Sequence, residues 1–180
     1  MKKYDCIFLD RDGTINPDPG YIKSLNEFKF YDYTIPALKK ISSQGYKFCI
    51  VTNQSGVSRG LIEKENLDQI NAYIKSEFKK NMIPLLGIYM CLDHPNSATI
   101  MRKPGPGMFL KAKKDNGIDL VNSLIIGDSY VDMQAGDLLG MDRMLVLSGM
   151  GKETLSSLPK DKMPNYIVNN LYEGVNKLCQ

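Results

Sequence analysis

The stretch YDCIFLDRDGT, residues 4–14, places two carboxylates two residues apart at the end of an apolar run. Residues 4–9 predict a buried strand, so Asp10 and Asp12 emerge on the same side at its carboxyl end. Like charges this close repel unless a metal ion or a proton neutralises them. The stretch therefore indicates a divalent-metal site with a possible carboxylate nucleophile, although an Asp-Gly pair alone is equally typical of a turn.

Short apolar runs alternate with helical periodicity outward from this stretch. We expect strands over residues 4–9, 46–52, 85–90, 123–127 and 143–147. Helices are expected from Thr34, as N-cap, to Gly45, and over about 63–80, 107–116 and 131–139, where apolar residues recur at helical spacing. This order predicts a three-layer, Rossmann-like α/β fold, with a parallel sheet and helices on both faces.

Bulk properties suit a single domain over residues 1–180. The net charge of +3 is too small to indicate nucleic-acid binding, and no apolar run approaches the length of a membrane span. The four cysteines lie far apart, which favours a reduced, cytoplasmic protein.

Two segments read as irregular. Residues 16–32, rich in proline, glycine and aromatic residues, are too long for an ordinary connection and directly follow the acidic pair. We interpret them as a flap over a substrate. Residues 91–107 hold the only histidine and three prolines.

Polar residues follow the other predicted strands as well. Thr52 and the amides behind it suit phosphate oxygens, and the cations Arg102 and Lys103 suit phosphoryl charge. After the fourth strand, Asp128 would complete an oxygen-rich Mg²⁺ site, and Asp132 would orient a ligand or a lysine from behind it.

Each of these motifs alone is also typical of helix capping or of a solvated loop. Their shared position at the carboxyl ends of parallel strands favours one ligand site. Phosphoryl transfer needs in-line positioning, a metal and cations, and the set supplies all three. We therefore interpret Asp10 as the nucleophile and Asp12 as the acid and base, with Asp10, Asp12 and Asp128 as metal ligands.

These residues resemble the haloacid dehalogenase superfamily of aspartyl-phosphate hydrolases, and the match spans nearly the whole chain. Its four motifs correspond in order to Asp10-x-Asp12-Gly13-Thr14, Thr52, Lys103 and Gly127-Asp128-x-x-x-Asp132. The longer strings 8–16, 51–60 and 102–104 are similar to the heptose bisphosphate and histidinol phosphate phosphatases. That subfamily has no large cap domain, which agrees with the chain length.

The resemblance implies a phosphatase that selects a small substrate with short loops. Residues 53–60 and 132–135 are closer to the heptose enzymes, which implies removal of the C7 phosphate from D-glycero-D-manno-heptose 1,7-bisphosphate. The substrate-contacting positions are then Asp18, Pro19, Gly20, Tyr21, Asn53, Gln54, Ser55, Arg59 and Arg102.

Two departures limit this comparison. The subfamily often holds a structural zinc with Cys-x-His and a later Cys-x-Cys, whereas only Cys91 matches here, so we expect no zinc. Ser129 stands where the heptose enzymes usually carry a lysine that contacts substrate.

Three alternatives stay open. Histidinol phosphate is a second substrate. A catalytically silent module would hold Mg²⁺ and a phosphorylated ligand without turnover. A nucleic-acid 3′-phosphatase is disfavoured because the clusters at residues 39–40, 79–80 and 111–114 read as solvated helix faces. We expect a monomer that binds neither nucleic acid nor a membrane.

Overall fold

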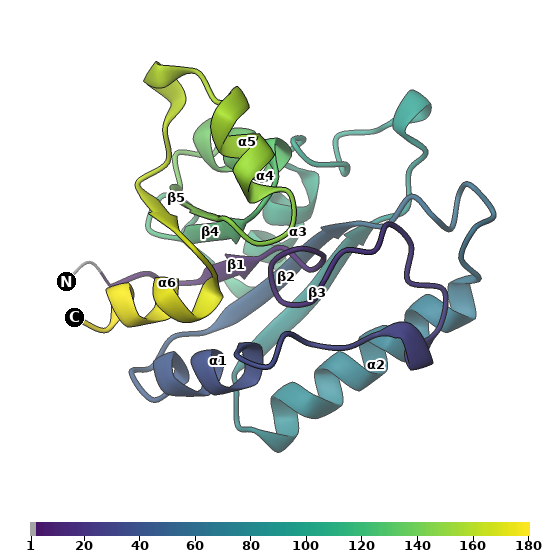
Figure 1. Ribbon diagram of the computed structural model, residues 1–180, viewed down its shortest axis with the longest axis horizontal. Helices are drawn as coiled ribbons and strands as arrows, with labels where there is room; N and C mark the ends of the chain where they lie inside the picture. Colours follow the sequence, from purple (N-terminus) through teal and green to yellow (C-terminus); the bar gives the residue numbers. More distant parts are fainter. Residues whose placement is uncertain (1–2) are drawn as a thin grey trace.

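The computed structural model describes residues 3–180, in which a six-stranded parallel sheet forms the centre (Figure 1). Its strands are β1 (Ile7–Leu9), β2 (Phe48–Asn53), β3 (Leu85–Cys91), β4 (Leu124–Gly127), β5 (Asp142–Val146) and β6 (Tyr166–Val168). They are ordered β3-β2-β1-β4-β5-β6. Phe8 of β1 pairs with Cys49 on one side and Ile125 on the other. The strand order reverses beside β1, and ligands of such sheets bind at the carboxyl ends of the strands next to that reversal.

Helices cover both faces of the sheet, as Figure 1 shows. On one face lie α1 (Thr34–Ser42), α2 (Lys64–Lys80) and α6 (Leu171–Leu178), and on the other lie α3 (Gly107–Asn116) and α4 (Tyr130–Leu138). Side chains alternate along β1, so Ile7 and Leu9 join the first core whereas Phe8 joins the second. The predicted three-layer fold is confirmed.

The C-terminal elements were not anticipated. They are β6, α6 and α5 (Gly151–Ser157), each between three and eight residues long. Thr34 was also wrongly expected to cap α1. Tyr33 holds the N-cap position, because the Thr34 hydroxyl instead donates a hydrogen bond to the Ile15 carbonyl at 2.7 Å.

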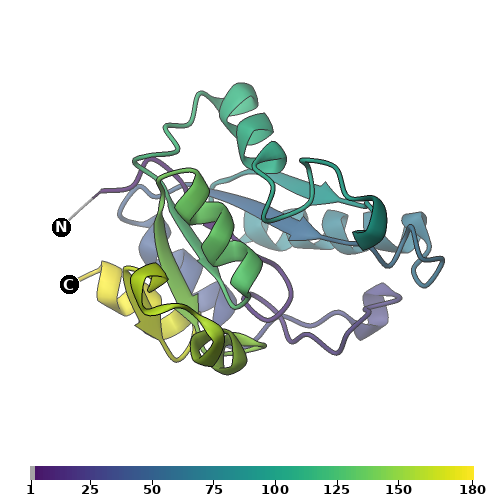
Figure 2. The same cartoon turned by 90° about the horizontal axis from the view of Figure 1, so that it is seen from above.

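The two long irregular segments are present where expected. Residues 16–32 contain only a short 3₁₀ turn, η1 (Leu25–Glu27), and residues 92–106 contain only η2 (Pro95–Ser97). Both project from the end of the molecule away from the termini (Figure 2). Phe28 and Phe30 anchor the first segment to α2, each with its ring centroid 6.0 Å from that of Tyr73. Within residues 3–180, no helix combines the length and apolar character needed to cross a membrane.

Candidate active site

A cavity of about 330 Å³ lies at the carboxyl ends of β1, β2 and β4. These three strand ends supply polar side chains to the cavity, which is why residues far apart in the chain meet here. The flap closes one side with Asp18, Gly20 and Tyr21, and the segment after β2 closes another with Gln54 and Ser55. Polar side chains from the strand ends and from the loops therefore share one cavity.

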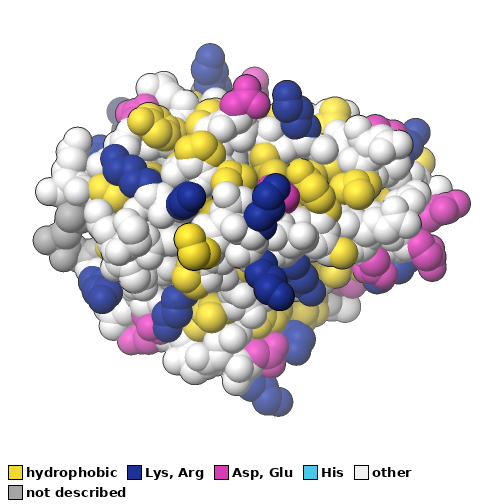
Figure 3. Space-filling view, turned by 90° about the horizontal axis from the view of Figure 1, so that it is seen from below, with side chains coloured by type: hydrophobic (Ala, Val, Ile, Leu, Met, Phe, Trp, Pro, Cys, Tyr) yellow, Lys and Arg dark blue, Asp and Glu magenta, His cyan; other side chains and the backbone are white. Residues whose placement is uncertain are grey.

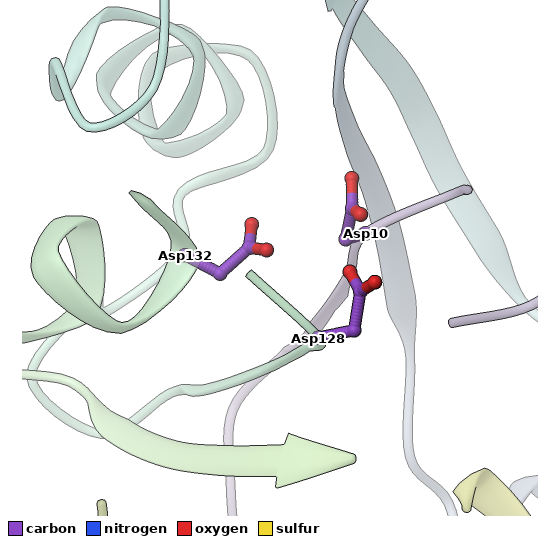
Figure 4. A group of neighbouring side chains, drawn as sticks. All are labelled: Asp10, Asp128 and Asp132. Atoms are coloured by element: carbon purple, nitrogen blue, oxygen red, sulfur yellow. The ribbon is translucent and has the colours of Figure 1, made fainter. Parts of the chain in front are cut away.

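A group of three buried carboxylates forms the acidic part of the site. Asp10, Asp128 and Asp132 each offer an oxygen, and these oxygens lie within 4.8 Å of one another. Figure 4 shows Asp132 reaching from α4 toward Asp10 and Asp128. The exposed fractions of the three residues are 7%, 2% and 0%. An all-oxygen set of this kind suits Mg²⁺.

Lys103 supplies the positive charge that the protein places in this group. Its Nζ donates hydrogen bonds to Asp10 Oδ1 at 2.7 Å, Asp132 Oδ1 at 2.6 Å and the Val51 carbonyl at 2.9 Å. Three carboxylates and one ammonium leave two negative charges uncompensated when all are ionised. Such an imbalance in a buried site fits a divalent cation.

Titration of these groups reflects the same imbalance. Burial raises the pKa of Asp10 well above its usual value, although Lys103 opposes the shift. Burial also raises the pKa of Asp128 to about 7. Burial alone would lower the pKa of Lys103, but Asp10 and Asp132 raise it above its ordinary value. Lys103 is therefore a permanent cation at neutral pH.

Asp12 is separate from this acidic group. Its carboxylate accepts hydrogen bonds from Arg11 Nη2 at 2.8 Å, Asn16 Nδ2 at 2.8 Å and Gln54 Nε2 at 2.8 Å. The cation that neutralises Asp12 is thus Arg11, which the sequence analysis passed over as the residue between two acids. Metal binding by the Asp12 carboxylate stays a prediction.

The end of β2 is tied to the loop that carries Lys103. Asn53 Nδ2 donates to the Lys103 carbonyl at 3.1 Å, and the Lys103 N–H donates to Asn53 Oδ1 at 3.0 Å. Thr52, which is 2% exposed, accepts a hydrogen bond from Gln54 Nε2 at 2.8 Å and lines the cavity. Thr52, Asn53 and Lys103 therefore line one cavity.

Asp128 is held by main-chain groups that no side-chain pattern predicts. Its Oδ2 accepts the Met150 N–H at 2.7 Å. Gly13 and Gly149 pack directly on the carboxylate: an added Cβ would lie 2.0 Å and 2.1 Å from Asp128 Oδ2, and both glycines have positive φ. These positions require glycine for space as well as for conformation.

Asp132 links the acidic group to the start of α4. Its Oδ2 accepts hydrogen bonds from the N–H and the hydroxyl of Ser129, and its Oδ1 accepts one from Lys103. Asp132 thus caps a helix and orients a lysine at the same time. Ser129 lines the cavity as well.

Most predicted site residues line this cavity. Those that do are Asp10, Asp12, Asp18, Gly20, Tyr21, Thr52, Asn53, Gln54, Ser55, Lys103 and Asp128. Pro19, Arg59, Arg102 and Asp132 do not. The part that each of these residues plays toward a substrate or a metal stays a prediction. Arg102 instead donates a long hydrogen bond, 3.4 Å, to the Asp93 carbonyl.

The loop compared with a zinc site contains other contacts. His94 Nδ1 accepts the N–H of Asn96 at 3.2 Å, and Cys91 is buried. Among residues 3–180, neither side chain belongs to a group of three potential metal ligands. The absence of a structural zinc stays a prediction.

The chain is similar to a family of hydrolases and to proteins named as phosphatases. Residues 100–174 match the HAD-hydrolase-like family model. Over 92% of its length the chain is 36% identical to the D-glycero-beta-D-manno-heptose-1,7-bisphosphate 7-phosphatase of Photorhabdus laumondii, covering 90% of that protein. Over 81% of its length it is 35% identical to the D-glycero-alpha-D-manno-heptose-1,7-bisphosphate 7-phosphatase of Burkholderia mallei, covering 80% of it.

A solved structure is similar over almost the whole chain. The D,D-heptose 1,7-bisphosphate phosphatase of B. bronchiseptica, crystallised with magnesium and phosphate, superposes with a TM-score of 0.88 at 29% identity. The alignment covers 97% of this chain and 98% of that one. Fold and site together define the class of haloacid dehalogenase-like hydrolases. More particularly, the chain belongs to the heptose-1,7-bisphosphate 7-phosphatase family within it.

Proposed function

We propose that this protein is a Mg²⁺-dependent phosphatase that removes the C7 phosphate from D-glycero-D-manno-heptose 1,7-bisphosphate through an aspartyl-phosphate intermediate. One observation carries the proposal. The Lys103 ammonium joins Asp10 and Asp132 beside Asp128, in a cavity that Asp12 also lines. A nucleophile, a fixed cation, a metal-binding group and a proton donor are then all within one site.

The reaction divides into two steps on the residues of the chain. An Asp10 oxygen attacks the phosphorus, the bond between phosphorus and the sugar oxygen breaks, and Asp12 gives that oxygen a proton. Asp12 then takes a proton from water, whose oxygen attacks the phosphorus and releases inorganic phosphate and free Asp10. Lys103 and Thr52 donate to phosphoryl oxygens as charge spreads over them.

Asp10, Asp12 and Asp128 are the residues that would hold Mg²⁺, and the uncompensated negative charge of the buried group that contains Asp10 and Asp128 supports this assignment. When bound, the ion neutralises charge on the phosphoryl oxygens. Asp132 is engaged by Lys103 and Ser129, so it keeps the lysine in place.

Loops on the cavity rim would select the substrate. Asp18 accepts the Gly20 N–H at 2.8 Å, which shapes the flap turn, and burial raises the pKa of Asp18 above its usual value. Ser129 offers a hydroxyl where a lysine would offer a second cation. Relatives named for both anomers support a heptose bisphosphate without choosing the anomer.

The test is a comparison of kcat/KM over phosphorylated metabolites in the presence of Mg²⁺. The panel contains both heptose 1,7-bisphosphate anomers, histidinol phosphate and a DNA 3′-phosphate. We expect a heptose anomer to be preferred, and Asp10→Asn to abolish phosphate release while its thermal melt stays cooperative. Preference for histidinol phosphate would reassign the substrate. Saturable ligand binding without release would show a silent module, and wild-type turnover by Asp10→Asn would refute the nucleophile.

We also propose that the protein acts as a single-domain monomer in the cytoplasm. Its four cysteines are free thiols, which supports a reducing compartment. On the face shown in Figure 3, lysines and arginines stand in several separate groups with white and yellow surface between them. On this face, the arrangement favours a small substrate over a nucleic acid, which needs a continuous basic track.

A further inference from the structure

Arg11 is a second deeply buried cation in the cavity, in addition to Lys103. It is 1% exposed, lies between Asp10 and Asp12 in the chain, and lines the cavity. Burying a guanidinium is costly unless its charge and its donors are engaged. The role of Arg11 can therefore be read from its partners.

The guanidinium grips the carboxylate of Asp12 as a fork. Arg11 Nε lies 3.0 Å from Asp12 Oδ1 and 3.1 Å from Oδ2, and Nη2 lies 2.8 Å from Oδ2. Bidentate pairs of this kind fix orientation as well as distance. Arg11 thereby determines where the Asp12 carboxylate points.

Gln54 completes the clamp from the end of the neighbouring strand β2. Its Oε1 accepts Arg11 Nη2 at 3.0 Å, while its Nε2 donates to Asp12 Oδ2 at 2.8 Å and to Thr52 Oγ1 at 2.8 Å. Gln54 thus connects the Asp12 carboxylate to Thr52 at the end of β2, the proposed phosphate site. The Asp12 carboxylate accepts hydrogen bonds from Arg11, Gln54 and Asn16 and is not one of the three carboxylates of the acidic group.

One nitrogen of Arg11 distinguishes it from an arginine that only stabilises the fold. Nη1 is buried and has no hydrogen-bond partner within the described residues. Both terminal nitrogens of Arg143, in contrast, donate to main-chain carbonyls, those of Lys162 and Met163. A buried donor without a protein acceptor beside a cavity indicates an acceptor that the ligand or an ordered water supplies.

We propose that Arg11 is a positioning residue for Asp12 in its role as proton donor to the leaving oxygen, an inference that rests on the proposed function. As the bond between phosphorus and oxygen breaks, the proton passes from Asp12 to the sugar oxygen. Arg11 gives up no proton and holds the donor within reach. Loss of the hydrogen bonds from Arg11 to Asp12 then slows the hydrolysis of esters whose leaving group needs that proton.

The experiment compares kcat/KM for two substrates. The leaving group of heptose 1,7-bisphosphate is a sugar alcohol, which needs a proton, whereas that of p-nitrophenyl phosphate is p-nitrophenolate, which departs without one. In Arg11→Lys we expect the value for the sugar to fall by about 100-fold, the scale of general acid catalysis, and the value for the aryl ester to fall far less. Asp12→Asn is the benchmark for this pattern. Arg143→Lys is the matched control and should leave the ratio of the two values unchanged.

Equal losses on both esters in a folded Arg11→Lys protein would overturn the inference, because they would mean general damage to the site. If that variant does not melt cooperatively, Gln54→Ala, which removes the other half of the clamp, must show the same selective loss. A wild-type protein that releases phosphate from neither ester would overturn the proposed function, and the inference with it.

Discussion

At the scale of single residues, Lys103 carries the charge balance of the site. It is 3% exposed and contacts two carboxylates of the acidic group. Removing one partner of a buried ion pair leaves the remaining charge without compensation, which is more costly than losing an exposed pair. Stability and the proposed catalysis consequently depend on the same side chain.

Lys103→Met tests that dependence. We expect the free energy of unfolding, measured in urea without divalent cations, to fall by about 3–5 kcal/mol. Lys111→Met is the control, because Lys111 forms an exposed pair with Asp115 at 3.0 Å. Its effect should stay within about 0.5 kcal/mol. A similar loss in both variants would mean that Lys103 has no special share in stability.

Gly13 is a second position where one atom decides the site. Gly13→Ala would place Cβ 2.0 Å from Asp128 Oδ2 on a backbone with φ of +81°. We expect Mg²⁺ affinity, measured by titration calorimetry, to fall by about 10-fold or more, because the ligand must move. Gly60→Ala also has positive φ but meets nothing within 4 Å, so it should melt lower while binding Mg²⁺ normally. Unchanged affinity in Gly13→Ala would contradict the packing described for Asp128.

At the scale of elements, α3 supports the loop that carries Lys103. The helix begins at Gly107, and Phe109 packs on Phe8 of β1 with ring centroids 5.1 Å apart. Phe109 is fully buried, whereas its neighbour Leu110 is 45% exposed. Substitutions at these two adjacent residues therefore distinguish the stability that comes from core packing from the stability of the helix itself.

Phe109→Ala should lower the free energy of unfolding by about 3–5 kcal/mol, because it removes a buried ring and leaves a cavity. Leu110→Ala should cost less than about 1 kcal/mol, since much of its side chain already contacts water. Thermal and urea unfolding of both variants measure the difference. Equal effects would place Phe109 outside the core.

The elements also show what the sequence alone could reveal. Buried parallel strands are recognised in a sequence as apolar runs that end in polar residues. The sequence therefore predicted β1, β2 and β4, and with them a ligand site at the carboxyl ends of these strands. Arg11 was missed because a cation between two acids looks like a solvated neighbour. The Met150 N–H was missed because a main-chain donor 22 residues from Asp128 leaves no trace in residue type. Contacts that the backbone makes, and contacts between residues far apart in the chain, cannot be predicted from the pattern of residue types.

At the scale of the whole molecule, stability and metal binding are linked through pH. The pKa of Asp128 rises to about 7 in the fold, so the folded state binds this proton more tightly than the unfolded chain does. The resulting stabilisation is complete below the ordinary pKa of aspartate, about 4, and is lost as pH rises to about 7. A cation that replaces the proton should restore it.

Melting temperatures with Mg²⁺ and with EDTA, measured between pH 5 and pH 8, test this link. We expect the gain from Mg²⁺ to grow as pH rises through about 7. In Asp128→Asn the gain should be small at every pH, because the titrating ligand is gone. A gain that is independent of pH in the wild-type protein would argue against Asp128 as the group that exchanges a proton for the metal.

The reciprocal bonds between Asn53 and Lys103 have an evolutionary consequence. They tie the end of β2 and the loop that carries Lys103 into one unit through bonds that involve no flap residue, and Asn16, which donates to Asp12 at 2.8 Å, stands at the first position of the flap. Mutations that change the length or the residues of the flap can accumulate without disturbing that unit. New substrates are then reached by exchanging the flap, and a graft of another loop between Asn16 and Tyr33 is a direct route to a redesigned phosphatase.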